Sequence, residues 1–139
     1  MKSVQTSTLL KLTLWLDAAV CAALAVLQLL GGSALAQELA LPRNLLLATG
    51  VFLLPWSAIL LWLTRSPAVA REWVIWVIAG NALWALGALG LLLADGVAST
   101  AWGSAYLLLH TVGVLFIAAL EWFGLRASTP MQPGDLVRA

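Results

Sequence analysis

Apolar residues fill four long stretches of the chain, and short segments with glycine, proline or charged residues separate them. A helix needs roughly 20 apolar residues to cross about 30 Å of hydrocarbon. Each stretch is long enough for one crossing, so the pattern predicts an all-α fold, a four-helix transmembrane bundle in a single domain spanning residues 1–126. The expected spans are Leu9–Leu30, Asn44–Thr64, Trp73–Ala94 and Ala101–Phe123.

The connections between these spans are too short to hold a folded domain outside the membrane. Their glycine, proline and capping residues predict turns. They contain Gly31-Gly32-Ser33 with Pro42-Arg43, then Arg65-Ser66-Pro67, then Asp95-Gly96 with Ser99 and Thr100 as candidate N-caps. The tail, residues 127–139, holds two prolines and a glycine and is expected to be a flexible cytoplasmic segment.

The composition excludes other classes of protein. Of the 139 residues, 63% are hydrophobic and 9% are charged, whereas a soluble domain carries about 25% charged residues. The seven Lys and Arg against six Asp and Glu are too few and too balanced for a nucleic-acid-binding face. One cysteine and one histidine cannot form an intrachain disulfide or a structural zinc site. The expected partner is therefore the lipid bilayer, without nucleic acid.

Positive charge predicts the orientation, because Lys and Arg accumulate in cytoplasmic loops. Of the seven Lys and Arg residues, Arg43 alone lies on one side of the predicted bundle. The other side holds Lys2, Lys11, Arg65, Arg71, Arg126 and Arg138. Both termini are therefore expected in the cytoplasm. Interfacial tryptophans agree with this orientation: Trp62, Trp73, Trp76 and Trp122 near the cytoplasmic ends, and Trp102 at the opposite end.

Two further interpretations remain open. The first span resembles a signal peptide with an Ala34-Leu35-Ala36 cleavage site, but its apolar stretch is long and contains Asp17, so we expect it to be retained. Asp17-Ala18 and Asn81-Ala82 match at an offset of 64 residues. That match suggests a parallel repeat of two helical hairpins, which would place Asp17 and Asn81 at equivalent depths.

Asp17 is the charged residue expected deepest in the hydrocarbon. A carboxylate there costs a few kcal/mol unless it is paired, protonated or hydrated, so it should face the bundle interior. Thr13, Asp17, Cys21 and Gln28 fall on one helical face, which we expect to point inward.

Counting 1.5 Å per residue places Ser57 and Asn81 at about the depth of Asp17. We expect these three side chains to form one polar layer, with Asn81 donating to the carboxylate. Two interpretations stand side by side: Asp17 as a proton-carrying or cation-binding group, and Asp17 as a polar link between helices.

Two tryptophans lie deeper than an interfacial belt, and their N–H groups need acceptors. Trp56 follows Pro55 in the second span, and Trp84 lies in the third. We expect both indoles near Asp17, in a small ligand-binding cavity that also includes Ser57 and Asn81 and opens toward the cytoplasm. A packed aromatic core without a ligand is the alternative.

The fourth span carries Tyr106, His110 and Glu121 near one stripe. His110 falls near the midplane and is expected to bond to Tyr106, Cys21 or Thr49 of the bundle. One histidine cannot ligate haem from both sides, and no cofactor is expected.

Glu121 lies close to the end of the fourth span. There it is expected to reach headgroup water and to pair with Arg126 or Arg65.

No nucleophile–base pair, metal cluster or phosphate-binding loop is present, so the chain is not expected to be an enzyme. The primary expectation is a structural or accessory bundle that self-associates as a homo-oligomer or joins a larger membrane complex. The alternative is a small proton-coupled transporter or small-molecule-binding bundle that uses Asp17.

Short motifs carry two resemblances. Four of them resemble motifs of small uncharacterised four-span bacterial membrane proteins: Trp15-Leu16-Asp17-Ala18, Leu54-Pro55-Trp56, Asn81-Ala82-Leu83-Trp84 and the segment Glu121–Arg126. This resemblance implies a location in the inner membrane of a bacterium. In outline, four short spans with an acid in the first also resemble small multidrug-resistance exporters, which implies that Asp17 exchanges protons for cations. That family's acid is a glutamate at mid-span, so only Asp17 is carried over.

Overall fold

The computed structural model describes residues 3–66, 68–94 and 100–131. Four helices dominate this part of the chain, and each is long and apolar enough to cross a membrane. The helices are α1 (Thr8–Leu39), α2 (Arg43–Arg65), α3 (Arg71–Leu93) and α4 (Ala101–Arg126). The prediction of an all-α fold is confirmed, with four helices whose length and composition suit a membrane crossing.

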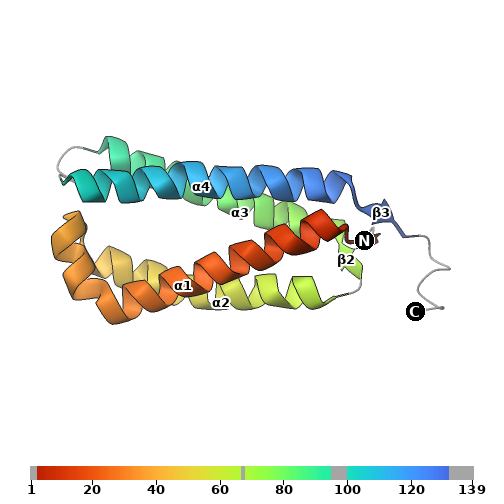
Figure 1. Cartoon of the computed structure of the whole chain (residues 1–139), viewed down its shortest axis with the longest axis horizontal. Coiled ribbons are helices and arrows are strands. Elements are labelled where there is room, and N and C mark those ends of the chain that lie inside the picture. Colours follow the sequence, from red (N-terminus) through yellow and green to blue (C-terminus); the bar gives the residue numbers. More distant parts are fainter. Residues whose placement is uncertain (1–2, 67, 95–99, 132–139) are drawn as a thin grey trace.

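The helices form two antiparallel hairpins. Helix α1 packs along α2, and α3 packs along α4; the hairpins meet through α1 and α4. Figure 1 shows the two hairpins approaching each other at the end where the chain begins. We call this the strand end and the opposite one, where α1 leads into α2, the far end.

Three short strands, which the sequence pattern did not predict, lie at the strand end (Figure 1). They are β1 (Ser3–Gln5), β2 (Ala68–Ala70) and β3 (Thr129–Pro130), in the order β2-β1-β3. Both pairings are antiparallel, with Val4 opposite Val69 and Gln5 opposite Thr129. Residues 129–130, expected in a flexible tail, are therefore paired, while residues 132–139 lie outside the described part.

Helices α1 and α4 come closest beside Gly124. A Cβ added there would lie 2.8 Å from the backbone of Leu10, so only glycine allows this approach. Ser7 reinforces it: its hydroxyl donates to the Gly124 carbonyl at 2.8 Å and caps α1 by accepting from the Leu10 N–H. The bundle is therefore tightly joined at the strand end.

Helix α1 is longer than the first predicted span. The segment Gly31–Ser33, expected as a connection, lies inside the helix, which continues to Leu39. The helix ends where Ala40 adopts a left-handed conformation with φ of 51° and its N–H bonds back to Ala36 and Gln37. Glycine in an apolar stretch therefore did not end the helix. At the start of α4, Thr100 caps as predicted by accepting from the Gly103 N–H, while Ser99 lies outside the described residues.

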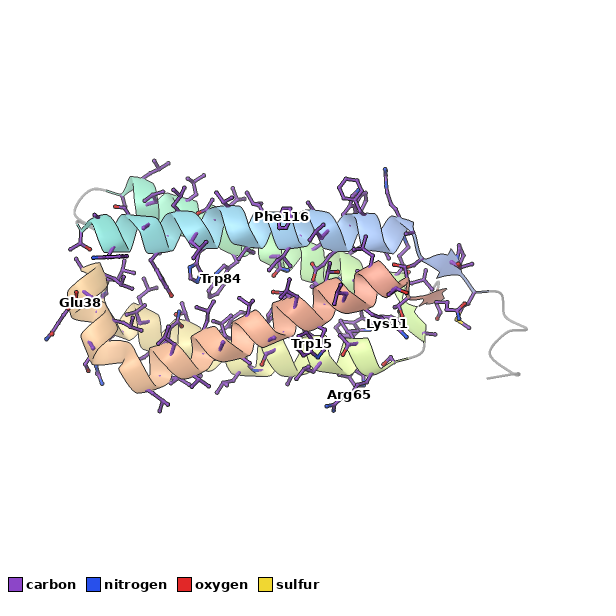
Figure 2. All side chains as sticks on the ribbon, in the orientation of Figure 1. Lys11, Trp15, Glu38, Arg65, Trp84 and Phe116 are labelled. Carbon is purple, nitrogen blue, oxygen red and sulfur yellow. The ribbon has the colours of Figure 1, made fainter. Side chains whose placement is uncertain are left out.

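The charged and aromatic side chains are distributed as a membrane protein requires. Figure 2 shows Lys11 and Arg65 at the strand end and Glu38 at the far end, with Trp15 and Phe116 on the outer surface. Much of that outer surface is apolar, including Leu30, Trp76 and Leu109. These exposed apolar side chains are suited to contact with lipid.

Candidate functional site

Two carboxyl groups from different helices meet at one amide. The Nδ2 atom of Asn81 on α3 lies 2.9 Å from Oδ2 of Asp17 on α1 and 3.2 Å from Oε2 of Glu121 on α4. The amide has two N–H hydrogens, one for each acid. Asn81 therefore joins three helices at one point, and the predicted bond from Asn81 to Asp17 is confirmed.

The inward orientation of the predicted polar face of α1 is also confirmed. Thr13, Asp17, Cys21 and Gln28 are all buried. The Cys21 thiol donates to Oδ1 of Asp17 over 3.5 Å. Both Asp17 oxygens therefore have a donor within the bundle.

The expectation for Glu121 is wrong. Its side chain is fully buried at 0% exposure and bonds to Asn81 rather than to arginine. Arg126 instead lies over the Trp122 ring, 5.1 Å from its centroid. Glu121 is thus a second buried acid beside Asp17, although its position in the sequence predicted a place near the headgroups.

The surroundings of Asp17 and Glu121 limit how much negative charge the two carboxyl groups can carry together. In the described part of the chain, the hydrogen bonds to the two carboxyls come from neutral donors, and no arginine or lysine pairs with either. One glutamate oxygen, Oε1, is buried without a partner. Two like charges this close in an apolar interior are strongly unfavourable, whereas one shared proton removes the repulsion.

A cavity of about 540 Å³ begins at Asp17 and Asn81 and extends toward the far end. All four helices line it, mostly with apolar side chains. This volume lies within the range of about 300–1,000 Å³ that is typical of pockets for drug-sized ligands. Asp17, Trp56, Asn81 and Trp84, all predicted at the site, are among the lining residues.

The opening expected at the predicted cytoplasmic ends of the spans, which lie at the strand end, is not found among the described residues. Fully buried side chains close the bundle beyond Asp17 on that side: Leu10, Leu14, Leu60, Leu63 and Val74. Phe52 of α2 and Leu83 of α3 line the cavity and are 49% and 71% exposed, so it reaches the outer surface between these helices.

Stacked aromatic rings form one wall. Phe52 lies between the two deep tryptophans, with ring centroids 5.9 Å from Trp56 and 5.7 Å from Trp84. In Figure 2, Trp84 projects between the two hairpins. Neither indole is among the described hydrogen-bond donors to Asp17, so the expected bonds are replaced by stacking.

Ser57 takes no part in the polar layer. It is buried, but its hydroxyl donates to the Leu54 carbonyl of its own helix at 2.8 Å, and it does not line the cavity. Serine commonly bonds to the preceding turn in this way. Glu121, rather than the expected Ser57, completes the polar layer with Asp17 and Asn81.

A second polar group lies in the cavity toward the far end. Thr49 donates to Oε1 of Gln28 at 2.8 Å, and Nε2 of Gln28 donates to the Tyr106 hydroxyl at 2.7 Å. His110 stacks on Tyr106, with ring centroids 4.3 Å apart. Gln28 and Thr49 were not predicted as site residues; the inward face shared by Gln28 and Asp17 was the available signal.

Of the three partners expected for His110, Tyr106 is found, but the bond is to its backbone carbonyl and stays within α4. The Nδ1 atom of His110 lies 3.0 Å from the Tyr106 backbone carbonyl, one turn earlier in α4, and the Nε2 atom is buried without a partner. A carbonyl can only accept, so Nδ1 carries the proton and Nε2 of the neutral ring is an acceptor.

No protein-family model, curated protein or solved structure matches the chain. Among the described residues, no three His, Cys, Asp or Glu side chains are grouped to hold a metal ion. The chemistry available at the site is therefore that of a carboxyl pair, an aromatic wall and a neutral polar group around an apolar cavity.

Proposed function

We propose that the chain is a membrane-embedded bundle that binds a small amphipathic cation in its cavity and releases a proton as it does so. The observation that carries this proposal is that Asp17 lines a cavity of about 540 Å³ while Glu121 lies directly behind it. The primary expectation of a structural or accessory bundle stays a prediction. The cavity favours ligand binding over that role.

The charge of the Asp17–Glu121 pair indicates which class of ligand the cavity binds. With one shared proton, Asp17 and Glu121 carry a single negative charge. A monovalent cation beside Asp17 stabilises the second negative charge, so the shared proton leaves to water as the ligand binds. The aromatic wall of Phe52, Trp56 and Trp84 suits an organic cation, since cations are attracted to aromatic faces.

Access follows from the opening between α2 and α3. The outer surface there would contact lipid, so an amphipathic ligand enters from the bilayer rather than through the closed strand end. The ligand therefore does not have to pass the buried side chains that close the strand end, which are Leu10, Leu14, Leu60, Leu63 and Val74.

The experiment uses the full chain in lipid nanodiscs with dodecyltrimethylammonium as the probe. Its charge is permanent, so any proton counted comes from the protein. We expect release of one proton for each cation bound, and Asp17→Asn to weaken binding roughly ten- to hundredfold. Glu121→Gln should bind without releasing a proton.

The matched control is Glu38→Gln, which neutralises an exposed glutamate near the end of α1. It should bind and release a proton like the wild type. Equal binding by the wild type and Asp17→Asn contradicts the proposal, and so does binding by the wild type without proton release.

We further propose that the strand end faces the cytoplasm of a bacterial inner membrane, supported by the basic side chains gathered there. Gln5 and Trp102 are exposed at opposite ends of the bundle. A membrane-impermeant thiol reagent added to intact cells should label Trp102→Cys and leave Gln5→Cys unlabelled. The reverse result contradicts this orientation.

A further inference from the structure

We infer that Tyr106 and His110 form a second subsite in the cavity, which binds an uncharged hydroxyl group at the far end of the ligand. This inference rests on the proposed function for the cationic end of the ligand. The hydroxyl subsite would recognise the other end of the ligand, and this recognition does not need Asp17 or Glu121.

The first observation is the unpartnered acceptor on His110. The residue lines the cavity, is 8% exposed and leaves Nε2 without a hydrogen-bond partner. The bond from Nδ1 to the Tyr106 carbonyl fixes Nε2 as the acceptor. A buried acceptor without a donor is costly. Nε2 itself is buried, so a ligand hydroxyl supplies that donor once the imidazole turns slightly toward the cavity that His110 lines.

The second observation is the direction of the bonds that end at Tyr106. Its hydroxyl oxygen accepts from Gln28, and Gln28 in turn accepts from Thr49. The phenolic hydrogen remains available to donate, and His110 Nε2 has no bond to it. The two rings lie with their centroids 4.3 Å apart. A donor and an acceptor on neighbouring rings match a hydroxyl group, which accepts from one and donates to the other.

The spacing fixes the shape of the ligand. Gln28 follows Asp17 by eleven residues on the same helix, a rise of about 16 Å. The part of the cavity between the two polar groups is lined by apolar side chains, including Leu24, Leu53 and Val114. The ligand class is therefore an elongated amphiphile with a monovalent cation at one end and a hydroxyl roughly 16 Å away.

The test compares dodecyltrimethylammonium with the same cation carrying a hydroxyl on its last carbon. A neutral hydrogen bond corresponds to roughly a fivefold change in affinity. In wild-type nanodiscs we expect the hydroxylated cation to bind about five- to tenfold more tightly than the plain one. Tyr106→Phe and His110→Phe should each remove this preference.

The plain cation is the internal control, because it has no hydroxyl to bond to Tyr106 or His110. The measured quantity is the ratio of the two affinities within each variant, so a change in the cavity that affects both cations alike cancels. A hydroxyl preference that persists in both variants, or is missing in the wild type, overturns the inference.

The neutral alcohol 1-dodecanol separates this inference from the proposed function. It needs no carboxylate, so Asp17→Asn should bind it as the wild type does, while Tyr106→Phe should bind it about fivefold more weakly. If Asp17→Asn binds both cations as tightly as the wild type does, the proposed function is wrong. The affinity for 1-dodecanol still tests the hydroxyl subsite in that case. Equal binding of the alcohol by Tyr106→Phe and the wild type overturns the subsite.

Discussion

Asp17 on α1 and Glu121 on α4 accept hydrogen bonds from the same nitrogen atom, Nδ2 of Asn81 on α3. Each acid is therefore part of the environment of the other. The protonation of one changes the charge that the other faces, so the pair titrates as a unit.

Replacing the shared donor should weaken the bundle. Asn81→Leu leaves two buried carboxyl groups without their common donor, and we expect a loss of about 2–4 kcal/mol. Thermal unfolding in detergent measures it. Asn44→Leu makes the same substitution at an exposed position near the start of α2 and should change stability by less than about 0.5 kcal/mol. Equal stability of the two variants contradicts the role given to Asn81.

An isosteric change at Glu121 should be tolerated. The amide of Glu121→Gln can accept from Asn81 and donate to Asp17, as a protonated glutamic acid does. We expect a stability change of about 1 kcal/mol or less, measured by the same unfolding experiment. A loss above roughly 3 kcal/mol would mean that the fold needs an ionised Glu121.

Glycine at the contact between α1 and α4 should be indispensable. In Gly124→Ala the new methyl group would lie 2.8 Å from the Leu10 backbone, so the helices must separate, at a cost of about 1–3 kcal/mol. Gly113→Ala is the matched control on the same helix, because nothing lies within 4 Å of its added Cβ. Alanine is the better helix former, so the control should be neutral or stabilising. Similar melting temperatures for the two variants would rule out this close contact.

The cap of α1 should contribute measurably. Ser7→Ala removes the acceptor for the Leu10 N–H and the donor to the Gly124 carbonyl, at a cost of about 1–2 kcal/mol. Ser66→Ala removes a hydroxyl that bonds to the Trp62 carbonyl at an exposed site, and should cost less than about 0.5 kcal/mol. Denaturant unfolding of both variants compares the two losses; a Ser7 effect no larger than the Ser66 effect would contradict the capping role.

The four helices could be predicted from the sequence because apolar length alone determines a membrane crossing. The extension of α1 through Gly31–Ser33 could not, since glycine breaks helices in water far more readily than in a bilayer. The three strands are too short to leave a pattern in the sequence. They form because the helices bring their flanking segments together at one end.

Within the site, counting depth along the helices correctly paired Asp17 with Asn81. The same counting failed for Glu121, because α4 continues to Arg126 and buried leucines separate Glu121 from the end of the bundle. Gln28 was expected on the inward face of the first span, two residues before the predicted end of that span at Leu30. The extension of α1 to Leu39 instead places it inside the bundle, where it meets Thr49 and Tyr106.

The central claim is that Asp17 and Glu121 share one proton, which a bound cation displaces. Infrared spectroscopy of the full chain in nanodiscs at neutral pH tests it most directly, because a protonated carboxylic acid has its own carbonyl band. We predict that band in the wild type, its loss on addition of dodecyltrimethylammonium, and its absence from the variant with both Asp17→Asn and Glu121→Gln. A wild-type spectrum with ionised carboxylates alone would contradict the account.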